Sequence, residues 1–258
     1  PEQIIPGVAN HYATAIANGY DFASVLIKTR EGRPIKVESN SLAKASCGIN
    51  ARVQASVLDL YDNQRVVVPQ KYGQAISWSE LTAEVSQKLE ALKGTDKSIV
   101  LLTQTFASPS TYKLISEFKQ KYTNVSHIVY DAISESEAAD AFQNKYGNRG
   151  LVNYDFSKAQ TIISIGADFL GDWQGGGFDA AYAKGRVPKN GKMSRHTQFE
   201  SNMTLSGANA DIRIALKPSQ QKVVLAKLYG KLFGTNVGGD LPLNLRTAVD
   251  RAASELLK

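Results

Sequence analysis

A glycine-rich stretch in the second half of the chain is the first place where chemistry could occur. It reads Gly166-Ala-Asp-Phe-Leu-Gly-Asp-Trp-Gln-Gly-Gly-Gly177 and follows an apolar run, Thr161–Ile165, typical of a buried strand. Glycines after a strand let backbone N–H groups approach a phosphate. However, the P-loop spacing of the first two glycines lacks the Lys-Ser/Thr of that motif, and Asp168 and Asp172 would repel a polyphosphate. The pattern favours a flexible glycine turn leading into a helix, with a nucleotide site as the alternative.

Other reactive side chains are few and scattered along the chain. With one cysteine, Cys47, and three distant histidines, His11, His127 and His196, the sequence offers no disulfide, thiolate cluster or histidine-pair metal motif. The two aspartates of the glycine-rich stretch could act as paired carboxylates, but no histidine lies near them in the sequence. No G-x-S-x-G nucleophile elbow occurs. We therefore predict no catalytic residue and no metal site.

Single polar or aromatic side chains have structural interpretations. Cys47 is interpreted as a small buried apolar group rather than a reactive thiol. His127 begins an apolar run and is expected to be a hydrogen-bonded core histidine. Trp78 and Trp173 are expected to anchor packing.

Composition and charge narrow the class of protein. The chain has 258 residues, of which 43% are hydrophobic and 21% charged. The mean hydropathy is −0.25, and no run reaches the roughly 18 apolar residues of a membrane-spanning helix. The sequence begins with Pro1 and has no signal peptide, which is typical of a processed or excised part of a longer protein.

The net charge of +6 is densest in one loop. Residues Lys184-Gly-Arg-Val-Pro-Lys-Asn-Gly-Lys-Met-Ser-Arg195 carry five cations and no aromatic side chain. Single-stranded nucleic acids need aromatic platforms for base stacking. The stretch therefore favours a solvated surface loop over a polyanion site, and we predict no nucleic-acid partner.

The N-terminal part of the chain is predicted to be an appendage built around a β-hairpin. Val25–Arg30 and Pro34–Glu38 are β-rich and flank a glycine-containing turn. The preceding residues 1–24 show no clear period. After the hairpin, three-to-four spacing of apolar residues predicts a short helix around Val53.

Helix and strand signals alternate from Ser77 onward. Capping residues, Pro at N1 and closing glycines predict helices at Ser77–Gly94, Ser108–Phe118, Ser134–Tyr146, 177–184, Ser219–Gly234 and Leu245–Leu256. Apolar runs predict strands at Ile99–Leu102, expected to be buried on both faces, and at Val125–Tyr130, Thr161–Ile165, Gln198–Glu200 and Ile212–Leu216. We expect an α/β fold, with an appendage at residues 1–94 and, at residues 95–258, a Rossmann-like parallel sheet with helices on both faces.

Several phrases of the sequence resemble molybdopterin-dependent oxidoreductases. These phrases are Val25–Asn40, Ala55–Arg65 and Ile76–Glu80. A second set of phrases more closely resembles one branch of this family, the molybdopterin-like iron–sulfur subunit of bacterial alternative complex III. That complex is a quinol:cytochrome c or quinol:oxidase oxidoreductase. This set is Phe106–Ser110, Ile165–Gly171, Met193–Arg195 and Thr204–Asp211.

The resemblance implies a molybdopterin-oxidoreductase-like fold that has lost its cofactor. It implies iron–sulfur clusters in a ferredoxin-like domain of the same polypeptide, haem c in a multi-haem cytochrome partner, and integral membrane quinol-binding subunits. The implied location is the periplasmic face of the bacterial inner membrane. The family's pterin-binding rim corresponds to Gly166, Asp168, Asn209 and Asp211, which we interpret as vestigial, structural positions. The cysteine motif for an N-terminal cluster is missing, since residues 1–24 contain no cysteine.

Three functions follow as expectations, in order. The first is a cofactor-free structural domain that holds the iron–sulfur and cytochrome parts of a respiratory complex in register. The second is a fragment of an active molybdopterin oxidoreductase whose metal ligand and clusters lie outside these residues. The third is a stand-alone nucleotide-binding α/β protein with its site at residues 166–177.

Overall fold

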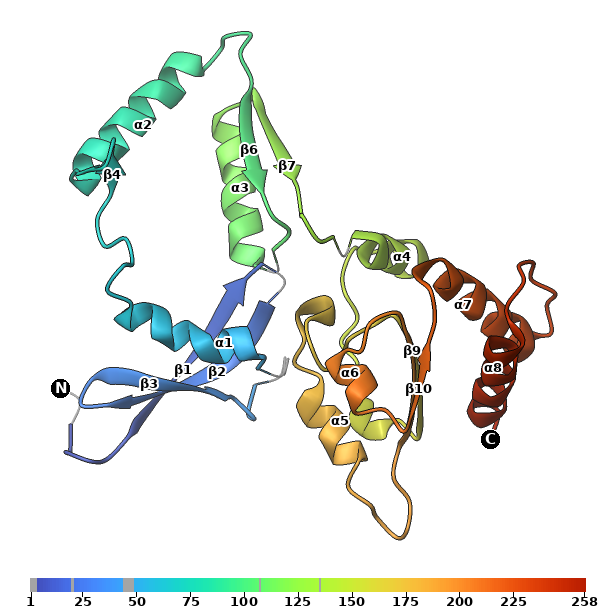
Figure 1. Cartoon of the computed structure of the whole chain (residues 1–258). Coiled ribbons are helices and arrows are strands. Elements are labelled where there is room, and N and C mark those ends of the chain that lie inside the picture. Colours follow the sequence, from blue (N-terminus) through green and yellow to red (C-terminus); the bar gives the residue numbers. More distant parts are fainter. Residues whose placement is uncertain (1–3, 20, 44–48, 107, 135) are drawn as a thin grey trace. The chain divides into compact units, whose positions relative to one another are not determined.

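The computed structural model describes residues 4–19, 21–43, 49–106, 108–134 and 136–258 (Figure 1). Cys47 lies outside the described residues, so its predicted burial stays a prediction. Contacts divide the chain into two units, Pro1–Arg149 and Gly150–Lys258. The predicted boundary between residues 94 and 95 falls inside the first unit and stays a prediction.

The first unit begins with a three-stranded antiparallel sheet of order β1-β2-β3. The strands are β1 (Asn10–Asn18), β2 (Asp21–Arg30) and β3 (Arg33–Ser39). The β2–β3 hairpin is confirmed, and its two turn residues Glu31 and Gly32 have φ angles of 50° and 77°, as a tight hairpin turn requires. Strand β1 was not expected, because most of its side chains are exposed and no apolar alternation marks it.

One face of this sheet is covered by the segment that follows it. The predicted short helix forms as α1 (Ala51–Ala55) and then continues as a 3₁₀ helix, η1 (Ser56–Tyr61). A small core joins them to the sheet, and its buried members are Ala23, Val25, Val37 and Val53. Asp21 fixes the start of β2 by accepting hydrogen bonds from Asn50 and Arg52.

Within the described residues, the rest of the first unit holds a two-stranded parallel sheet of β6 and β7, a short antiparallel β4–β5 pair and three helices. Its elements are β4 (Gln70–Lys71), β5 (Gln74–Ala75), α2 (Trp78–Leu92), β6 (Ile99–Thr103), α3 (Pro109–Lys121), β7 (Val125–Val129) and α4 (Ser136–Tyr146). The capping box of α2 is confirmed, since Ser77 Oγ accepts from the Glu80 N–H and Glu80 accepts from the Ser77 N–H. Ser108 and Pro109 start α3 as predicted.

Strand β6 is buried on one face rather than on two. Ile99 packs with Tyr122 and Val125, whereas Val100 and Leu102 are 53% and 67% exposed. The expectation of a strand buried on both faces is therefore wrong: an apolar run alone does not report how many layers cover a sheet. The predicted hydrogen bond of His127 is confirmed, because its Nε2 lies 2.9 Å from Thr103 Oγ1, but its predicted core position is wrong, since its side chain is only half-buried. Trp78 is exposed and anchors no packing.

The second unit is a three-stranded parallel sheet with helices on both faces (Figure 1). The sheet order is β10-β9-β8, with β8 (Thr161–Ile165), β9 (Arg195–Glu200) and β10 (Ile212–Ala215). Two 3₁₀ helices, η2 (Phe156–Lys158) and η3 (Trp173–Gly175), flank β8. The helices are α5 (Asp179–Gly185), α6 (Leu205–Ala208), α7 (Pro218–Phe233) and α8 (Leu243–Leu256). The predicted α/β class, with parallel pairing and an N-terminal hairpin, is confirmed.

Strand β9 is central and carries a different core on each face. Phe199 packs with Val224 and Leu228 of α7 and with the apolar stripe of α8. On the opposite face, Ile162 of β8 joins an aromatic cluster with Phe169, Phe178 and Tyr182. Because both faces are covered, five of the six side chains of β9 are buried.

The ends of α7 illustrate which local signals are reliable. Gly234 closes the helix in the left-handed conformation, with φ 69°, as predicted. Ser219 was expected to cap its start, but the cap is Lys217, two residues earlier, and the helix begins at Pro218. The Lys217 N–H donates to Gln220 Oε1 at 2.8 Å, and Pro218 needs no hydrogen-bond partner at the first helical position. Among the described residues, no helix is both long and apolar enough to cross a bilayer.

The core around β9 predicts a strong contrast between two phenylalanines. Replacing Phe199, which is fully buried, by alanine should lower the free energy of unfolding of the second unit by about 3–5 kcal/mol. Phe233→Ala, at a position that is 66% exposed, is the matched control and should cost less than about 1 kcal/mol. Denaturant unfolding in a Trp78→Phe background, followed by Trp173 fluorescence, measures both, and equal losses would contradict the described packing.

Candidate functional site

The carboxyl edge of the sheet in the second unit is where a doubly wound fold binds ligands. Three segments leave the sheet there: the glycine-rich segment after β8, the turn before α6, and the start of α7. The sequence placed two candidate residues, Gly166 and Asp168, in the first of these segments. The polar groups at this edge decide whether a ligand can bind.

Asp168 ties the segment after β8 to the segment after β9. Its Oδ1 accepts hydrogen bonds from the backbone N–H of Ser206 at 2.9 Å and from the Ser206 hydroxyl at 2.8 Å. The same hydroxyl oxygen accepts from the Leu170 N–H at 2.9 Å, and Ser206 is fully buried. A Cβ at position 171 would overlap Asp168 Oδ2, which explains why this position is a glycine. The carboxylate therefore serves as an internal connector.

Glu200, the last residue of β9, is a buried carboxylate with a full set of partners. It is 2% exposed and pairs with Arg213 of β10, whose Nε lies 2.5 Å from Oε1. Thr204 donates to it twice, from its hydroxyl at 2.6 Å and from its N–H at 3.2 Å. Burial alone would raise the pKa of Glu200, but the hydrogen bonds from Thr204 and Arg213 outweigh it and lower the pKa below its usual value. A Cβ at Gly207 would overlap this carboxylate.

Gly166 is covered by the first turn of α7. It has φ +69°, and its N–H continues the sheet by donating to the Phe199 carbonyl at 2.8 Å. An added Cβ would lie 2.7 Å from Oε1 of Gln221. Gln221 in turn donates to the Ser201 hydroxyl at 3.3 Å. The space beside Gly166 is thus occupied by an amide of the chain itself.

The remainder of the glycine-rich segment forms the turn that the sequence favoured. Gly175, Gly176 and Gly177 all have positive φ angles, and the chain passes through η3 into α5. Trp173 is half-buried in this segment and packs near Phe178, which confirms its predicted packing role.

The other two candidate residues lie at the opposite edge of the sheet. Asp211, just before β10, accepts two hydrogen bonds from Arg186, at 2.6 and 2.8 Å, and one from the His196 N–H at 2.7 Å. The bonds from Arg186 lower the pKa of Asp211. Asn209 offers its carbonyl to the Tyr182 hydroxyl at 3.0 Å.

The fold therefore does not gather the four candidates into one rim. Gly166 bonds to Phe199, and Asp211 bonds to His196, three residues earlier on β9. That separation corresponds to roughly 10 Å along a strand. Gly166 and Asp168 stay together at the carboxyl edge, and Asn209 and Asp211 stay together at the amino edge.

A buried polar chain crosses between these edges, and the sequence did not indicate it. His196 is fully buried on β9, with Nδ1 3.2 Å from the Tyr182 hydroxyl and Nε2 3.1 Å from Oε1 of Gln198. Gln198 then donates to the Ala167 carbonyl at 3.2 Å. Burial lowers the pKa of His196 below its usual value. No sequence pattern marks this chain, because the residues of β9 from His196 to Glu200 are buried on both faces, so polar residues do not separate an exposed face from a core face.

The residues at the carboxyl edge do not fit a phosphate-bearing pterin cofactor. A dianionic ligand needs cationic or N–H donors, but Arg213 is committed to Glu200, and Asp168 adds negative charge. Within the described glycine-rich segment, Gln174 Oε1 is buried without a hydrogen-bond partner. This oxygen is an acceptor, so it cannot donate to a phosphate. Within the described ranges, no group of three or more His, Cys, Asp or Glu side chains could hold a metal ion.

Comparisons with known proteins give the class of this fold. No family model matches the sequence. A solved structure, acetylene hydratase from Pelobacter acetylenicus, superposes with a TM-score of 0.54 and 16% identity, covering 90% of this chain and 35% of that one. The chain has a molybdopterin-oxidoreductase-like α/β fold.

A curated relative is similar in sequence. Over 157 residues, 58% of this chain, the identity is 27% to the menaquinone reductase, molybdopterin-binding-like subunit, of Nitratidesulfovibrio vulgaris strain Hildenborough. The match covers 22% of that relative, so this chain spans well under half of its length.

The space around Glu200 predicts a contrast between two glycines. Gly207→Ala forces a methyl group onto the buried carboxylate and should lower the free energy of unfolding of the second unit by about 1–3 kcal/mol. Gly238→Ala, where a Cβ meets nothing within 4 Å, is the control and should change it by less than about 0.5 kcal/mol. Equal effects in urea unfolding would contradict the packing described for Glu200.

The burial of His196 predicts a pH dependence with a defined sign. Its pKa is lowered from 6.5, so below about pH 6.5 the unfolded chain takes up a proton that the folded chain does not. Stability should fall from pH 7.5 to 5.5, by at most about 1.4 kcal/mol per pH unit. The facing acids Asp211 and Glu200 have lowered pKa values and stay charged across this interval.

The measurement uses a Trp78→Phe background, in which Trp173 is the remaining tryptophan and reports the second unit. In that background, His196→Gln should flatten the fall in stability between pH 7.5 and 5.5. An unchanged slope in the variant would show that another group causes it.

Proposed function

We propose that this chain is a structural, pterin-free domain of a membrane-associated, quinone-linked electron-transfer complex of the alternative complex III type. The observation that carries the proposal is the closed carboxyl edge of the second unit. Asp168 is bonded to Ser206, Glu200 to Arg213, and Gln221 lies beside Gly166. The name of the curated relative, a molybdopterin-binding-like subunit of a menaquinone reductase, supports a quinone-linked setting.

In this proposal the domain acts by holding other parts in place. Electrons pass efficiently only across short gaps, so a rigid body that fixes the spacing between cofactors contributes without carrying one. The expected neighbours are an iron–sulfur ferredoxin-like domain of the same polypeptide, a multi-haem cytochrome c subunit and integral quinol-binding subunits. The proposed location is the periplasmic face of the bacterial inner membrane.

A second candidate is a fragment of an active molybdopterin oxidoreductase. It is favoured by the partial coverage of the relatives, because the matched parts cover 22% of one and 35% of the other. Cofactor ligands could then come from chain outside these residues. In the structural proposal the carboxyl edge takes no part in turnover, whereas in the second candidate it lines the reaction site.

Variants at the carboxyl edge separate the two candidates. In the intact complex, Asp168→Ala should reduce the amount that assembles, because the bonds to Ser206 are lost, while turnover per assembled complex stays within about twofold of wild type. Lys217→Ala, exposed at the same edge, is the control and should change neither quantity.

The readout is quinol oxidation normalised to the haem content of the purified complex. A loss of about a hundredfold in turnover per assembled complex, for either variant, would mean that the edge lines a reaction site. The structural proposal would then be wrong.

A further inference from the structure

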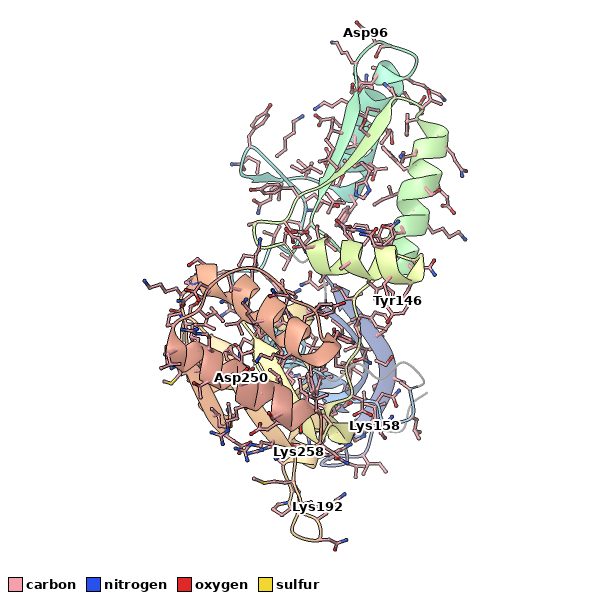
Figure 2. The ribbon with its side chains drawn as sticks, turned by 90° about the vertical axis from the view of Figure 1, so that its right-hand side faces the viewer. Asp96, Tyr146, Lys158, Lys192, Asp250 and Lys258 are labelled. Carbon is pink, nitrogen blue, oxygen red and sulfur yellow. The ribbon has the colours of Figure 1, made fainter. Side chains whose placement is uncertain are left out.

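A projecting loop between α5 and β9 carries positive charge that the function proposed above does not use. We name residues 184–194 the basic hairpin, in which Lys184 belongs to the last turn of α5 and lies at the base. Two lysines near its end, Lys189 and Lys192, form an isolated antiparallel bridge in which each N–H donates to the other carbonyl, at 2.8 and 3.0 Å. Asn190 and Gly191 form the turn, with φ angles of 52° and 73°. Figure 2 shows Lys192 at the tip of a loop that extends away from the sheet of its own unit.

The base of the basic hairpin is fixed to the second unit. The Ser194 N–H donates to the Gly185 carbonyl at 2.9 Å, and the Arg186 guanidinium donates to the Ser194 carbonyl. Arg186 also forms the two-bond ion pair with Asp211. The hairpin is thus held at its base with its tip presented to the surroundings.

The charge of the basic hairpin is not balanced within the chain. No acidic residue occurs between Asp179 and Glu200. Of the five cations from Lys184 to Arg195, the two arginines are paired, Arg186 with Asp211 and Arg195 with Glu255. The three lysines, Lys184, Lys189 and Lys192, form no ion pair with any acid of the described residues. Elsewhere in this unit, Lys158 and Lys231 each have an aspartate partner, and Lys227 donates to the Val237 carbonyl, whereas Lys217 and Lys222 likewise form no ion pair with an acid of the described residues.

Apolar side chains accompany these lysines. Val187 is 58% exposed and Met193 is 50% exposed, and Pro188 lies between Val187 and Lys189. A projecting tip that combines unpaired lysines with exposed apolar groups suits a surface that is anionic outside and apolar beneath. The boundary of a bilayer with anionic lipids has both properties.

The type of cation favours a lipid surface over an acidic protein. Protein–protein interfaces are enriched in arginine and depleted in lysine, since the guanidinium fork binds carboxylates in two-point geometry. Both arginines of this stretch form ion pairs within the chain. What the hairpin presents is lysine, a flexible point charge that suits a fluid layer of phosphate headgroups.

We infer that the basic hairpin is a peripheral membrane contact. Its three lysines lie among anionic phospholipid headgroups, and Val187 and Met193 press against the boundary of the acyl chains. A lysine near an anionic bilayer strengthens partitioning roughly fivefold, so the three together contribute roughly a hundredfold.

Vesicle binding tests this contact with the intact 258-residue chain. The probes are vesicles of equal parts phosphatidylglycerol and phosphatidylcholine, and vesicles of phosphatidylcholine alone. Wild type should co-sediment with the anionic vesicles, weakly with the neutral ones, and should be released as salt rises from about 0.05 to 0.5 M. The Lys184→Gln/Lys189→Gln/Lys192→Gln variant should bind the anionic vesicles roughly a hundredfold more weakly.

A matched control removes the same charge elsewhere. Lys97→Gln/Lys119→Gln/Lys145→Gln changes three exposed lysines of the first unit and should retain most of the binding. Val187→Ser/Met193→Ser keeps every charge and should weaken binding to the anionic vesicles several-fold at about 0.05 M salt, because the apolar contribution is lost while the electrostatic one remains. Thermal unfolding by circular dichroism checks that each variant is folded.

Two outcomes would overturn the membrane contact. One is equal binding of wild type to anionic and neutral vesicles, which would leave an acidic protein surface as the partner of the lysines. The other is equal weakening of binding by the hairpin variant and its matched control, which would show that binding depends only on the net charge of the chain. Neither outcome touches the structural proposal, because the carboxyl-edge residues take no part in the hairpin.

Discussion

A carboxylate inside an apolar sheet must be fully paired, and this requirement at Glu200 organises the second unit. Arg213 supplies the counter-charge from the neighbouring strand, and Thr204 supplies two hydrogen bonds from the turn before α6. Leaving such a group without its partners would cost several kcal/mol. The pairing therefore sets where α6 lies, and α6 brings Ser206 to Asp168.

The same pairing explains why the edge that could bind a ligand is closed. The polar groups of Asp168, Glu200 and Arg213 at this edge are engaged within the chain, and the position beside Gly166 is filled by Gln221. A buried network satisfied in this way favours one rigid arrangement. Rigidity suits the proposed role of holding neighbouring cofactors at fixed distances, and the membrane contact inferred for the basic hairpin would be a separate means of orienting the chain.

Local signals in the sequence predicted most elements, and failures arose where distant residues decide. The capping box at Ser77, the strand Thr161–Ile165 and the closing Gly234 each depend on a few neighbouring residues, and each is confirmed. Strand β1 is exposed and carries no pattern, and the cover of β6 depends on which helices pack on it. For the site, the phrase Thr204–Asp211 is continuous in sequence but runs through α6 from one sheet edge to the other. The pairs that close the edge join residues 13 and 38 positions apart, which no local pattern marks.

The central claim is that this chain binds no pterin. The metal and pterin content of the proposed complex tests that claim most directly. The complex would be purified from native membranes, and its molybdenum, tungsten, iron and fluorescent pterin oxidation products would be counted per haem. The account predicts iron beyond that of haem, with neither molybdenum nor tungsten nor pterin. Stoichiometric pterin with molybdenum or tungsten would contradict it, because the carboxyl edge described here would then have to open.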